Sequence, residues 1–328
     1  MSKDKSSLKE IAKIIKGANN IALFGHISPD IDCFGSLFGL YQGLVALGKK
    51  AQIYSHESLR FDQATLFDES LVKLGGFNPN EYDLLIAVDT ATKDRLGEYK
   101  EAFTTHPNTV KIDHHRVGSC YAEYDYVDFT KSSCSEIIYT LLTILKVNIT
   151  PEIATALYAG LSADTGSFIY SNVNDNSFET GKLLFERKAD IRKINRTLYQ
   201  SLTRVQLEMK KHMYRNMEII DDQVALIVVT NDDLVKAGAC KQDCENHSAE
   251  LMAINGINVS CAIIERVPNE FCCSFRGKDD YNVSVIAQRL GGGGHVSAAG
   301  CRFICESAEK AKAQVLDAIR KYLKSREA

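Results

Sequence analysis

The chain has 328 residues, of which 45% are hydrophobic and 25% are charged, as is typical of a globular protein. This composition excludes a wholly disordered, collagen-like or low-complexity chain. The 39 Lys and Arg residues nearly balance the 42 Asp and Glu residues, which excludes a general polyanion-binding surface. Any contact with nucleic acid is therefore expected in a local pocket, and the length predicts two domains.

The N-terminal segment, residues 1–17, lacks the apolar region of a signal peptide, and no stretch approaches the ~18 apolar residues of a membrane-spanning helix. The ten cysteines are spread over a chain that is long enough to form a core without disulfides. Adjacent Cys272 and Cys273, on a predicted strand, point to opposite faces, which suits buried thiols better than a bridge. We expect a soluble, reduced, cytoplasmic protein that does not contact the membrane.

In the first half of the chain, short apolar segments alternate with helical patterns. Strands are predicted at residues 20–25, 51–54, 83–88 and 109–112. Helices are predicted over residues 33–49, where apolar residues recur every three or four positions, over residues 133–145 after a capping box, and from Pro151. This alternation predicts an α/β fold with a parallel sheet and helices on both faces.

The second half of the chain begins with a charged helical segment without Gly or Pro, read as a helical linker. Further strands are predicted at residues 223–230, 258–266 and 270–276, followed by a helix, a glycine cluster and a last helix from Ser307. The sequence thus predicts a first domain over residues 1–190, a helical linker over 191–217 and a smaller C-terminal α/β domain over 218–328.

Aspartate and histidine residues follow the predicted strands of the first domain. Because the carboxyl ends of parallel strands share one crevice, the loops after three strands are expected to bring together seven side chains, His26, Asp30, Asp32, Asp89, Asp113, His114 and His115. Asp164, at the end of the helix that starts at Pro151, adds another carboxylate, which a nearby cation would stabilise against the helix dipole.

Several carboxylates in one crevice repel each other unless protons or metal ions neutralise them. Oxygen donors with two imidazoles, and no thiolate at matching positions, suit Mn²⁺ better than a structural zinc site. Taken singly, each Asp is more often a turn residue or a helix cap, and Asp32 could simply cap its helix. Taken together, the HxxxDxD spacing and the Asp-His-His triplet predict a site for two metals that catalyses phosphoryl chemistry.

The chain resembles the DHH/DHHA1 phosphoesterase family, which is named for an Asp-His-His triplet. The resemblance rests on five motifs in the family's order, GHISPDIDCFGS (25–36), AVDTA (87–91), DHHR (113–116), ADTGSF (163–168) and GGGGHVSAAG (291–300). It implies one metal held by residues His26, Asp30 and Asp89, and a second held by Asp32, Asp89, His114 and Asp164. Asp89 would bridge two Mn²⁺ ions, for which Mg²⁺ or Co²⁺ could substitute, and a metal-bridging hydroxide would attack phosphorus.

The resemblance also implies roles for residues around the metals. His115 and Arg116 would lie near the scissile phosphate, and Asp113 would support the ligands. Ile31 and Cys33 differ from the small residues that family members often carry there, but neither is a ligand position. In the second domain the glycine loop would face the metal crevice and bind the substrate, with contacts at Arg276, Gly292, Gly293, Gly294, His295 and Ser297. From the residues alone, this loop lacks GK[ST] and is not a Walker P-loop, but its glycines allow close backbone approach to an anion.

The sequence alone leaves several functional alternatives open. The resemblance favours hydrolysis of short oligoribonucleotides and 3′-phosphoadenosine-5′-phosphate, and a phosphodiesterase for cyclic di-AMP or its linear product pApA is the alternative. A catalytically inactive nucleotide-sensing module would be expected to lack at least one ligand, yet all six are present. A zinc site at Cys240, Cys244 and His247, or at Cys301 and Cys305, matches no common spacing. A homodimer occurs among relatives, but no sequence feature demands one.

Overall fold

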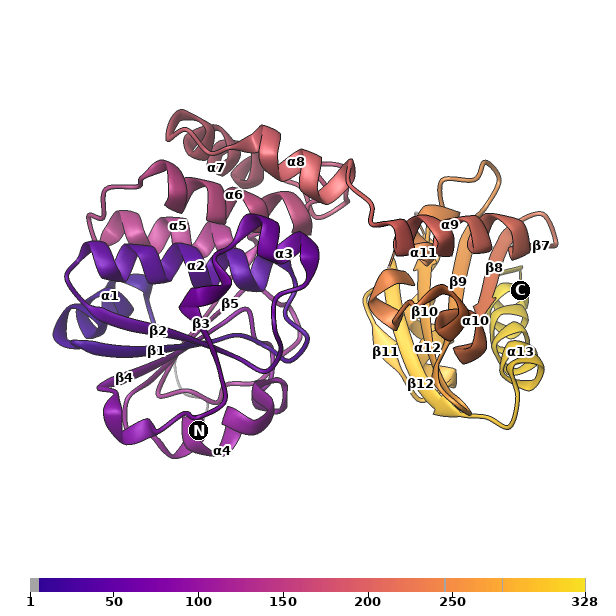
Figure 1. The fold of residues 1–328 in the computed structure, drawn as a ribbon, viewed down its shortest axis with the longest axis horizontal. Helices are drawn as coiled ribbons and strands as arrows, with labels where there is room; N and C mark the ends of the chain where they lie inside the picture. Colours follow the sequence, from indigo (N-terminus) through magenta and orange to yellow (C-terminus); the bar gives the residue numbers. More distant parts are fainter. Residues whose placement is uncertain (1–5, 245, 279, 328) are drawn as a thin grey trace. The chain divides into compact units, whose positions relative to one another are not determined.

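The computed structural model describes residues 6–244, 246–278 and 280–327, and it forms two compact units, Met1–Ser201 and Leu202–Ala328 (Figure 1). The sequence-predicted linker contains two helices that belong to different units. The first is α8 (Ile191–Tyr199), in the N-terminal unit, and the second is α9 (Arg204–Asn216), in the C-terminal unit. Among the described residues, no helix combines the length and apolar character that crossing a bilayer requires.

The N-terminal unit is built on a six-stranded parallel sheet, which confirms the predicted fold class. Its strands occur in the order β3-β2-β1-β4-β5-β6. Their bounds are β1 (Asn20–Phe24), β2 (Lys50–Ser55), β3 (Val72–Leu74), β4 (Leu84–Val88), β5 (Thr109–Asp113) and β6 (Tyr124–Val127). Every residue of β4 and β5 is buried, as expected for strands covered on both faces.

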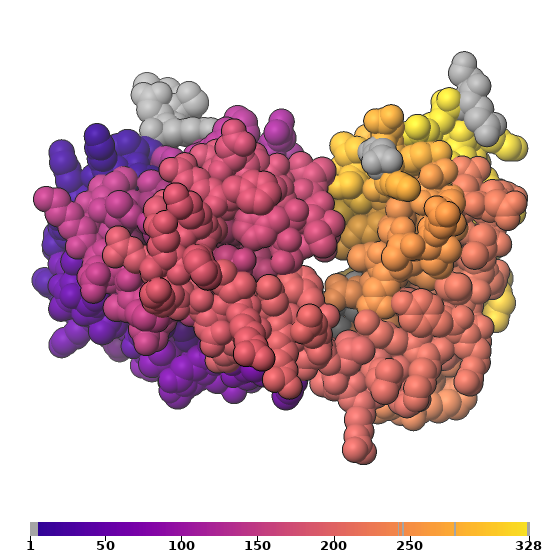
Figure 2. All heavy atoms as spheres, turned by 90° about the horizontal axis from the view of Figure 1, so that it is seen from above, coloured from indigo at the N-terminus to yellow at the C-terminus, as the bar shows by residue number. Residues whose placement is uncertain are grey.

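Helices cover both faces of this sheet. One face packs against α1 (Leu8–Gly17), α2 (Ile31–Ala46), α5 (Cys134–Ile144) and α6 (Pro151–Asp164). The other face carries an aromatic cluster around Phe24, closed by η3 (Lys93–Tyr99) and α4 (Lys100–Thr105). The remaining helices of the unit are α3 (Phe61–Leu66), η1 (Glu69–Leu71), η2 (Pro79–Glu81) and α7 (Asp175–Glu186). In Figure 2, magenta and pink residues from the later helices form much of the visible surface of this unit.

Two glycines allow α2, α5 and α6 to approach each other closely. A Cβ atom on Gly35 of α2 would lie 2.6 Å from the carbonyl oxygen of Ala156 on α6. A Cβ atom on Gly160 of α6 would overlap the Ser135 hydroxyl and lie 2.5 Å from Asp32 Oδ1. The missing side chains therefore let the three helices meet around the Asp32 carboxylate.

The C-terminal unit is a second six-stranded sheet in the order β11-β12-β10-β9-β8-β7, antiparallel except for the β8–β9 pair. Its strands are β7 (Glu218–Ile220), β8 (Val224–Val229), β9 (Val259–Val267), β10 (Glu270–Gly277), β11 (Gly293–Gly294) and β12 (Ala298–Ile304). Its helices besides α9 are α10 (Asn231–Ala237), η4 (Lys241–Cys244), α11 (His247–Leu251), α12 (Val283–Arg289) and α13 (Ala308–Glu327). They form separate hydrophobic clusters on the two faces of the sheet, α9 to α11 on one and α12 with α13 on the other.

Candidate metal centre

The candidate residues lie at the carboxyl ends of three adjacent strands. His26 follows β1 by two residues, Asp89 follows β4 directly, and Asp113 is the last residue of β5. Helix α2 contributes two more carboxylates, because Asp30 is its N-cap and Asp32 lies in its first turn. Helix α2 begins two residues before the predicted position, so Asp30 rather than Asp32 caps it. The Asp30 carboxylate accepts a hydrogen bond from the backbone N–H of Cys33 at 2.9 Å.

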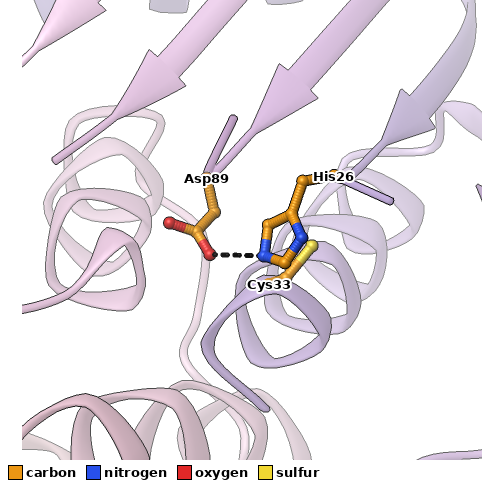
Figure 3. Close-up of side chains that lie close together, drawn as sticks. All are labelled: His26, Cys33 and Asp89. Atoms are coloured by element: carbon orange, nitrogen blue, oxygen red, sulfur yellow. Dashed lines mark ion pairs between the residues drawn. The ribbon is translucent and has the colours of Figure 1, made fainter. Parts of the chain in front are cut away.

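His26 lies close to two carboxylates, and Figure 3 shows its ion pair with one of them, Asp89. Its Nε2 is 3.6 Å from both Asp30 Oδ2 and Asp89 Oδ2. The Nδ1 atom of the same ring lies 2.8 Å from the carbonyl oxygen of Ile27, so Nε2 is the ring nitrogen that faces the carboxylates. His26, Asp30 and Asp89 therefore form the first group of donors.

His114 forms the centre of a second group. Its Nε2 is 3.4 Å from Asp89 Oδ1, 3.3 Å from Asp164 Oδ2 and 3.9 Å from Asp32 Oδ2. The two oxygens of Asp89 thus face different imidazoles, Oδ2 toward His26 and Oδ1 toward His114. This geometry joins the two donor groups through a single carboxylate that is 2% exposed.

The local fold fixes the second group through hydrogen bonds to backbone. Asp32 accepts bonds from the N–H groups of Cys134 at 2.7 Å and Ser135 at 3.1 Å, which start helix α5. The positive end of that helix stabilises the carboxylate. Asp113 Oδ1 accepts from the backbone of His114 at 2.9 Å and lies 2.7 Å from His115 Nδ1. Asp113 thereby holds the backbone of His114 and the imidazole of His115.

The ionisation of the cluster shows a shortage of positive charge. Burial opposes charging of His26, but Asp30 and Asp89 outweigh it and raise the pKa of His26 to about 10. Burial and the charge of Asp89 raise the pKa of Asp32 to about 7. Burial, together with Asp32 and Asp30, raises the pKa of Asp164 well above its usual range. Protons thus balance a surplus of carboxylates, and divalent cations would supply the same charge.

The donor set fits such cations. Asp89 Oδ1 is buried without a hydrogen-bond partner, although two imidazoles lie near it. Among the residues that the structure describes, three groups of donor atoms could hold an ion. The first group is His26, Cys33 and Asp89; the second is Asp89, His114 and His115; and the third is Asp32, His114 and Asp164. Carboxylate oxygens and imidazole nitrogens suit Mn²⁺, Mg²⁺ or Zn²⁺.

Two neighbours of His26 lie in this site outside the ligand set that the resemblance implied. Cys33 is fully buried, and its Sγ lies within 4.8 Å of donor atoms of His26 and Asp89 (Figure 3). Its place in the first turn of α2, next to Asp32, is the signal that could have indicated it. Arg95 lies on η3, and its Nη2 is 2.6 Å from His26 Nδ1 and 3.2 Å from the Ile27 oxygen. No spacing in the sequence connects Arg95 to His26.

A buried lysine beneath the Asp-His-His triplet was also missed. Lys111 on β5 is 1% exposed, and its Nζ lies 3.5 Å from Asp113 Oδ2 and 3.6 Å from Asp125 Oδ1. The ammonium also donates to the carbonyl oxygens of Ala91 and Ser119 at 3.3 and 3.0 Å. Lys111 therefore compensates the charge of the carboxylate that orients the histidines.

The substrate-binding residues predicted in the C-terminal unit gather at one end of its sheet. Arg276, near the end of β10, pairs in register with Ala298 of β12, and the carbonyl of Ser297 accepts from the next N–H, that of Gly277, at 3.0 Å. The backbones of His295 and Ala298 exchange hydrogen bonds of 2.7 and 3.3 Å, which closes the turn between β11 and β12.

The glycine loop of this turn has little room for side chains at two positions. A Cβ atom on Gly292 would overlap the carbonyl oxygen of Gly300, and one on Gly294, where φ is +146°, would lie 2.5 Å from Ala299 Cα. A Cβ atom on Gly293 would meet nothing within 4 Å. The loop thus presents bare backbone on one side and close packing on the other.

All ten cysteines lie in the described part of the chain and are free thiols. Two cysteine sets were considered as zinc sites in the sequence. Within the described residues, no group that could hold a metal contains Cys240, Cys244 and His247, and none contains Cys301 and Cys305.

Two family models match the chain. Residues 20–161 match the DHH family, N-terminal domain, and residues 221–325 match the DHHA1 domain. The chain therefore contains a DHH domain followed by a DHHA1 domain. The predicted resemblance is thereby confirmed, and the two matched segments lie in the two structural units.

Curated relatives match nearly the whole length of the chain. A protein from Mycoplasma genitalium named bifunctional oligoribonuclease and PAP phosphatase NrnA is 28% identical, over 90% of this chain and 92% of its own. The protein of the same name from Thermus thermophilus is 29% identical, over 96% of this chain and 93% of its own. An exopolyphosphatase-related protein from Bacteroides fragilis has the same fold, with a TM-score of 0.90 at 23% identity over 98% of this chain and 97% of that one.

Proposed function

We propose that this DHH-family hydrolase is a Mn²⁺-dependent two-metal phosphoesterase that cleaves short oligoribonucleotides and removes the 3′-phosphate of 3′-phosphoadenosine-5′-phosphate. One observation carries the two-metal part, namely that the Asp89 oxygens face two separate imidazole–carboxylate groups, at 3.6 Å from His26 and 3.4 Å from His114. The substrate part is supported by the names of relatives that match about the full length of the chain.

The described residues divide into two ligand sets under this proposal. His26, Asp30 and Asp89 would hold one cation, and the other would be held by Asp32, Asp89, His114 and Asp164. The cations would make a water nucleophilic at neutral pH and neutralise charge on the phosphoryl group. Mg²⁺ or Co²⁺ are expected substitutes, because they accept similar ligands.

The chain's own residues would position the phosphate. His115 donates from Nδ1 to Asp113 Oδ1 at 2.7 Å, which fixes the ring and leaves Nε2 available to hydrogen-bond a phosphate oxygen. Arg116 is exposed next to it, and its guanidinium lies 5.3 Å from the Phe129 ring. A guanidinium held in this way presents several N–H donors to an anion.

We further propose that the DHHA1 domain binds the nucleotide through Arg276 and the loop of Gly292, Gly293, Gly294, His295 and Ser297. Bare backbone at Gly293 leaves room for a ligand to approach the strand closely. A cytoplasmic location and a homodimer stay predictions from the sequence.

The test is hydrolysis of a matched substrate panel by the full-length protein with Mn²⁺, Mg²⁺ or no added cation. The panel contains a dinucleotide RNA, a five-residue RNA, 3′-phosphoadenosine-5′-phosphate, cyclic di-AMP, pApA and pyrophosphate. We expect the two RNAs and 3′-phosphoadenosine-5′-phosphate to be cleaved with Mn²⁺, and two Mn²⁺ ions per chain by elemental analysis.

Each other outcome would change the assignment. Cyclic di-AMP or pApA as the best substrate would replace the proposed substrates with the signalling dinucleotides. Cleavage of pyrophosphate alone would contradict the proposed role of the DHHA1 domain. Nucleotide binding without turnover by the metal-loaded protein would identify a sensing module.

A further inference from the structure

The segment after Asp164 has an unusual backbone. Gly166, Ser167 and Phe168 have φ values of +56°, +56° and +67°, so three consecutive residues are left-handed. Two of them carry side chains, for which this conformation is unfavourable. Such strain persists only where the surroundings hold it in place, and it is concentrated at functional sites.

Packing on the inner side holds this turn. The Phe168 ring stacks on Phe178 with ring centroids 5.2 Å apart and approaches Tyr158 at 6.3 Å. Phe168 packs against the hydrophobic core, whereas the next two side chains are exposed. Ile169 is 81% exposed and Tyr170 is 55% exposed.

The turn is also tied back to the metal centre. The backbone N–H of Tyr170 donates to the carbonyl of Thr165 at 3.0 Å, next to Asp164. The Asn172 side chain donates to the carbonyl of Asp164 itself at 2.9 Å and to that of Ser132 at 3.2 Å. Tyr170 therefore lies in a short loop that starts after Asp164, a residue of the second donor group, and is hydrogen-bonded back to it through Asn172.

The Tyr170 ring lies against backbone. A Cβ atom on Gly166 would come within 2.5, 2.6 and 2.8 Å of three atoms of this ring, so the ring covers the glycine closely. One side of the ring is thus supported, and more than half of the side chain stays open to solvent. A single exposed aromatic residue is ordinary on a protein surface, but one fixed by a strained turn beside a candidate metal ligand is not.

We propose that Tyr170 is a specificity-determining residue that stacks on a nucleobase of the substrate while the adjacent centre binds its phosphate. An aromatic ring tolerates any base, because every base has a flat π-face, and this suits an enzyme that cleaves short RNA of mixed sequence. The inference rests on the proposed function and extends it, since it assigns a base-binding position to the DHH domain in addition to the glycine loop of the DHHA1 domain.

The chain contains no tryptophan, which allows a direct binding test. In the full-length variant Tyr170→Trp, the single indole would report on stacking. The probe is a non-hydrolysable dinucleotide analogue, compared with the same sugar-phosphate backbone without bases. We expect the base-bearing analogue to quench the indole emission and the base-free backbone to leave it unchanged.

The matched control is Tyr214→Trp. Tyr214 lies on α9 and is 54% exposed, nearly the same as Tyr170, but it belongs to the other unit and lies on no strained turn. Its emission should not respond to either analogue. Equal quenching at both positions, or none at position 170, would overturn the proposal.

Kinetics provide the second test. Loss of one base stack corresponds to about a 5- to 150-fold weaker interaction. Tyr170→Ala should therefore raise KM for a dinucleotide RNA within that range, with kcat changed less than about twofold. Tyr170→Phe should restore the KM, since stacking needs the ring and not the hydroxyl. A dinucleotide that lacks the stacked base should not distinguish Tyr170→Ala from the unaltered chain.

These outcomes separate the inference from the proposed function. If the unaltered chain cleaves none of the RNA or nucleotide substrates, the proposed function fails. If it cleaves them and Tyr170→Ala retains the original KM, only the role of Tyr170 is overturned.

Discussion

The candidate sites of the two units are built from different features of the chain. In the N-terminal unit, charged side chains converge from the ends of three parallel strands and from helix α2, and two of the carboxylates are buried, Asp32 fully and Asp89 at 2% exposure. In the C-terminal unit, the candidate loop depends on missing side chains, since Gly292 and Gly294 leave no space for a Cβ atom and Gly293 leaves open space. The first site is defined by charge, and the second by backbone shape.

This difference affects what each site costs in stability. Converging carboxylates repel each other and lose hydration on burial, so the N-terminal unit needs compensating groups such as the α5 N-terminus and Lys111. Exposed glycine backbone carries no such penalty beyond its conformational entropy. We therefore expect substitutions in the first site to affect cations, catalysis and folding together, and a substitution at the open position of the second site, Gly293, to affect substrate binding alone.

The largest effect is expected for Asp89→Ala. This variant removes the one carboxylate that faces both imidazoles, so both cations would lose a ligand. Turnover of the best RNA substrate should fall by about 10³-fold or more, because two-metal activation of the water is lost. Initial rates and Mn²⁺ content per chain measure the effect.

The matched control for this variant is Asp83→Ala, at the opposite end of the same strand. Asp83 accepts hydrogen bonds from the backbone of Asn19 and Asn20 at 2.8 and 2.9 Å, away from the donor groups. Its removal should leave turnover within about twofold, since it touches neither imidazole. Substantial residual activity in Asp89→Ala would contradict the shared-ligand arrangement.

Lys111→Met should produce the largest loss of stability. It leaves Asp113 and Asp125 buried without their common cation, and breaking a buried ion pair on one side costs roughly 3–5 kcal/mol. Denaturant unfolding of the full-length chain measures this loss. Lys182→Met, at a side chain that is 72% exposed, should change stability by less than about 0.5 kcal/mol.

A second variant shows whether charge is the cause. If the unpaired carboxylates are responsible, Lys111→Met combined with Asp125→Asn should recover part of the lost stability. Equal stability of the single and double variants would instead indicate that Lys111 acts through its packing and its bonds to Ala91 and Ser119.

Much of the N-terminal unit could be predicted because its signals are local. Short apolar strands that alternate with helices specify a parallel sheet, and a parallel sheet places the ends of β1, β4 and β5 together. The approach of His26, Asp89 and His114 therefore followed from topology and the positions of these residues. The orienting bonds of Asp113 are equally local, since they join neighbours in sequence.

The unanticipated residues depend on packing between distant segments. Arg95 reaches His26 across 69 residues, and the carboxylate of Asp32 meets α5 across more than 100. Cys33 approaches Asp89 from the first turn of helix α2, and these two residues are distant in sequence. The left-handed turn at Ser167 and Phe168 has no signal in residue type, since only Gly166 favours positive φ.

A smaller effect is expected from Gly35→Ala, which tests the close helix packing around Asp32. The added methyl would lie 2.6 Å from the carbonyl oxygen of Ala156, and overpacking of this kind costs typically 1–3 kcal/mol. Thermal unfolding of the metal-free protein measures the change. Gly17→Ala, at a position with nothing within 4 Å of the added methyl, should be neutral or slightly stabilising. Equal effects at the two glycines would show that the helices can move apart without penalty.

The smallest effect, and the one most specific to the second unit, is expected from Gly293→Val. Its side chain has open space, and the residue is paired as strand β11, where a β-branched residue is accommodated. The melting temperature and Mn²⁺ content should therefore stay unchanged, while KM for a dinucleotide RNA rises by about tenfold, roughly 1.4 kcal/mol, because the new side chain occupies the approach to the backbone. Gly292→Ala, which overlaps the carbonyl oxygen of Gly300, should instead lower the melting temperature. Loss of Mn²⁺ from Gly293→Val would contradict the proposed division of substrate recognition and cation binding between the two units.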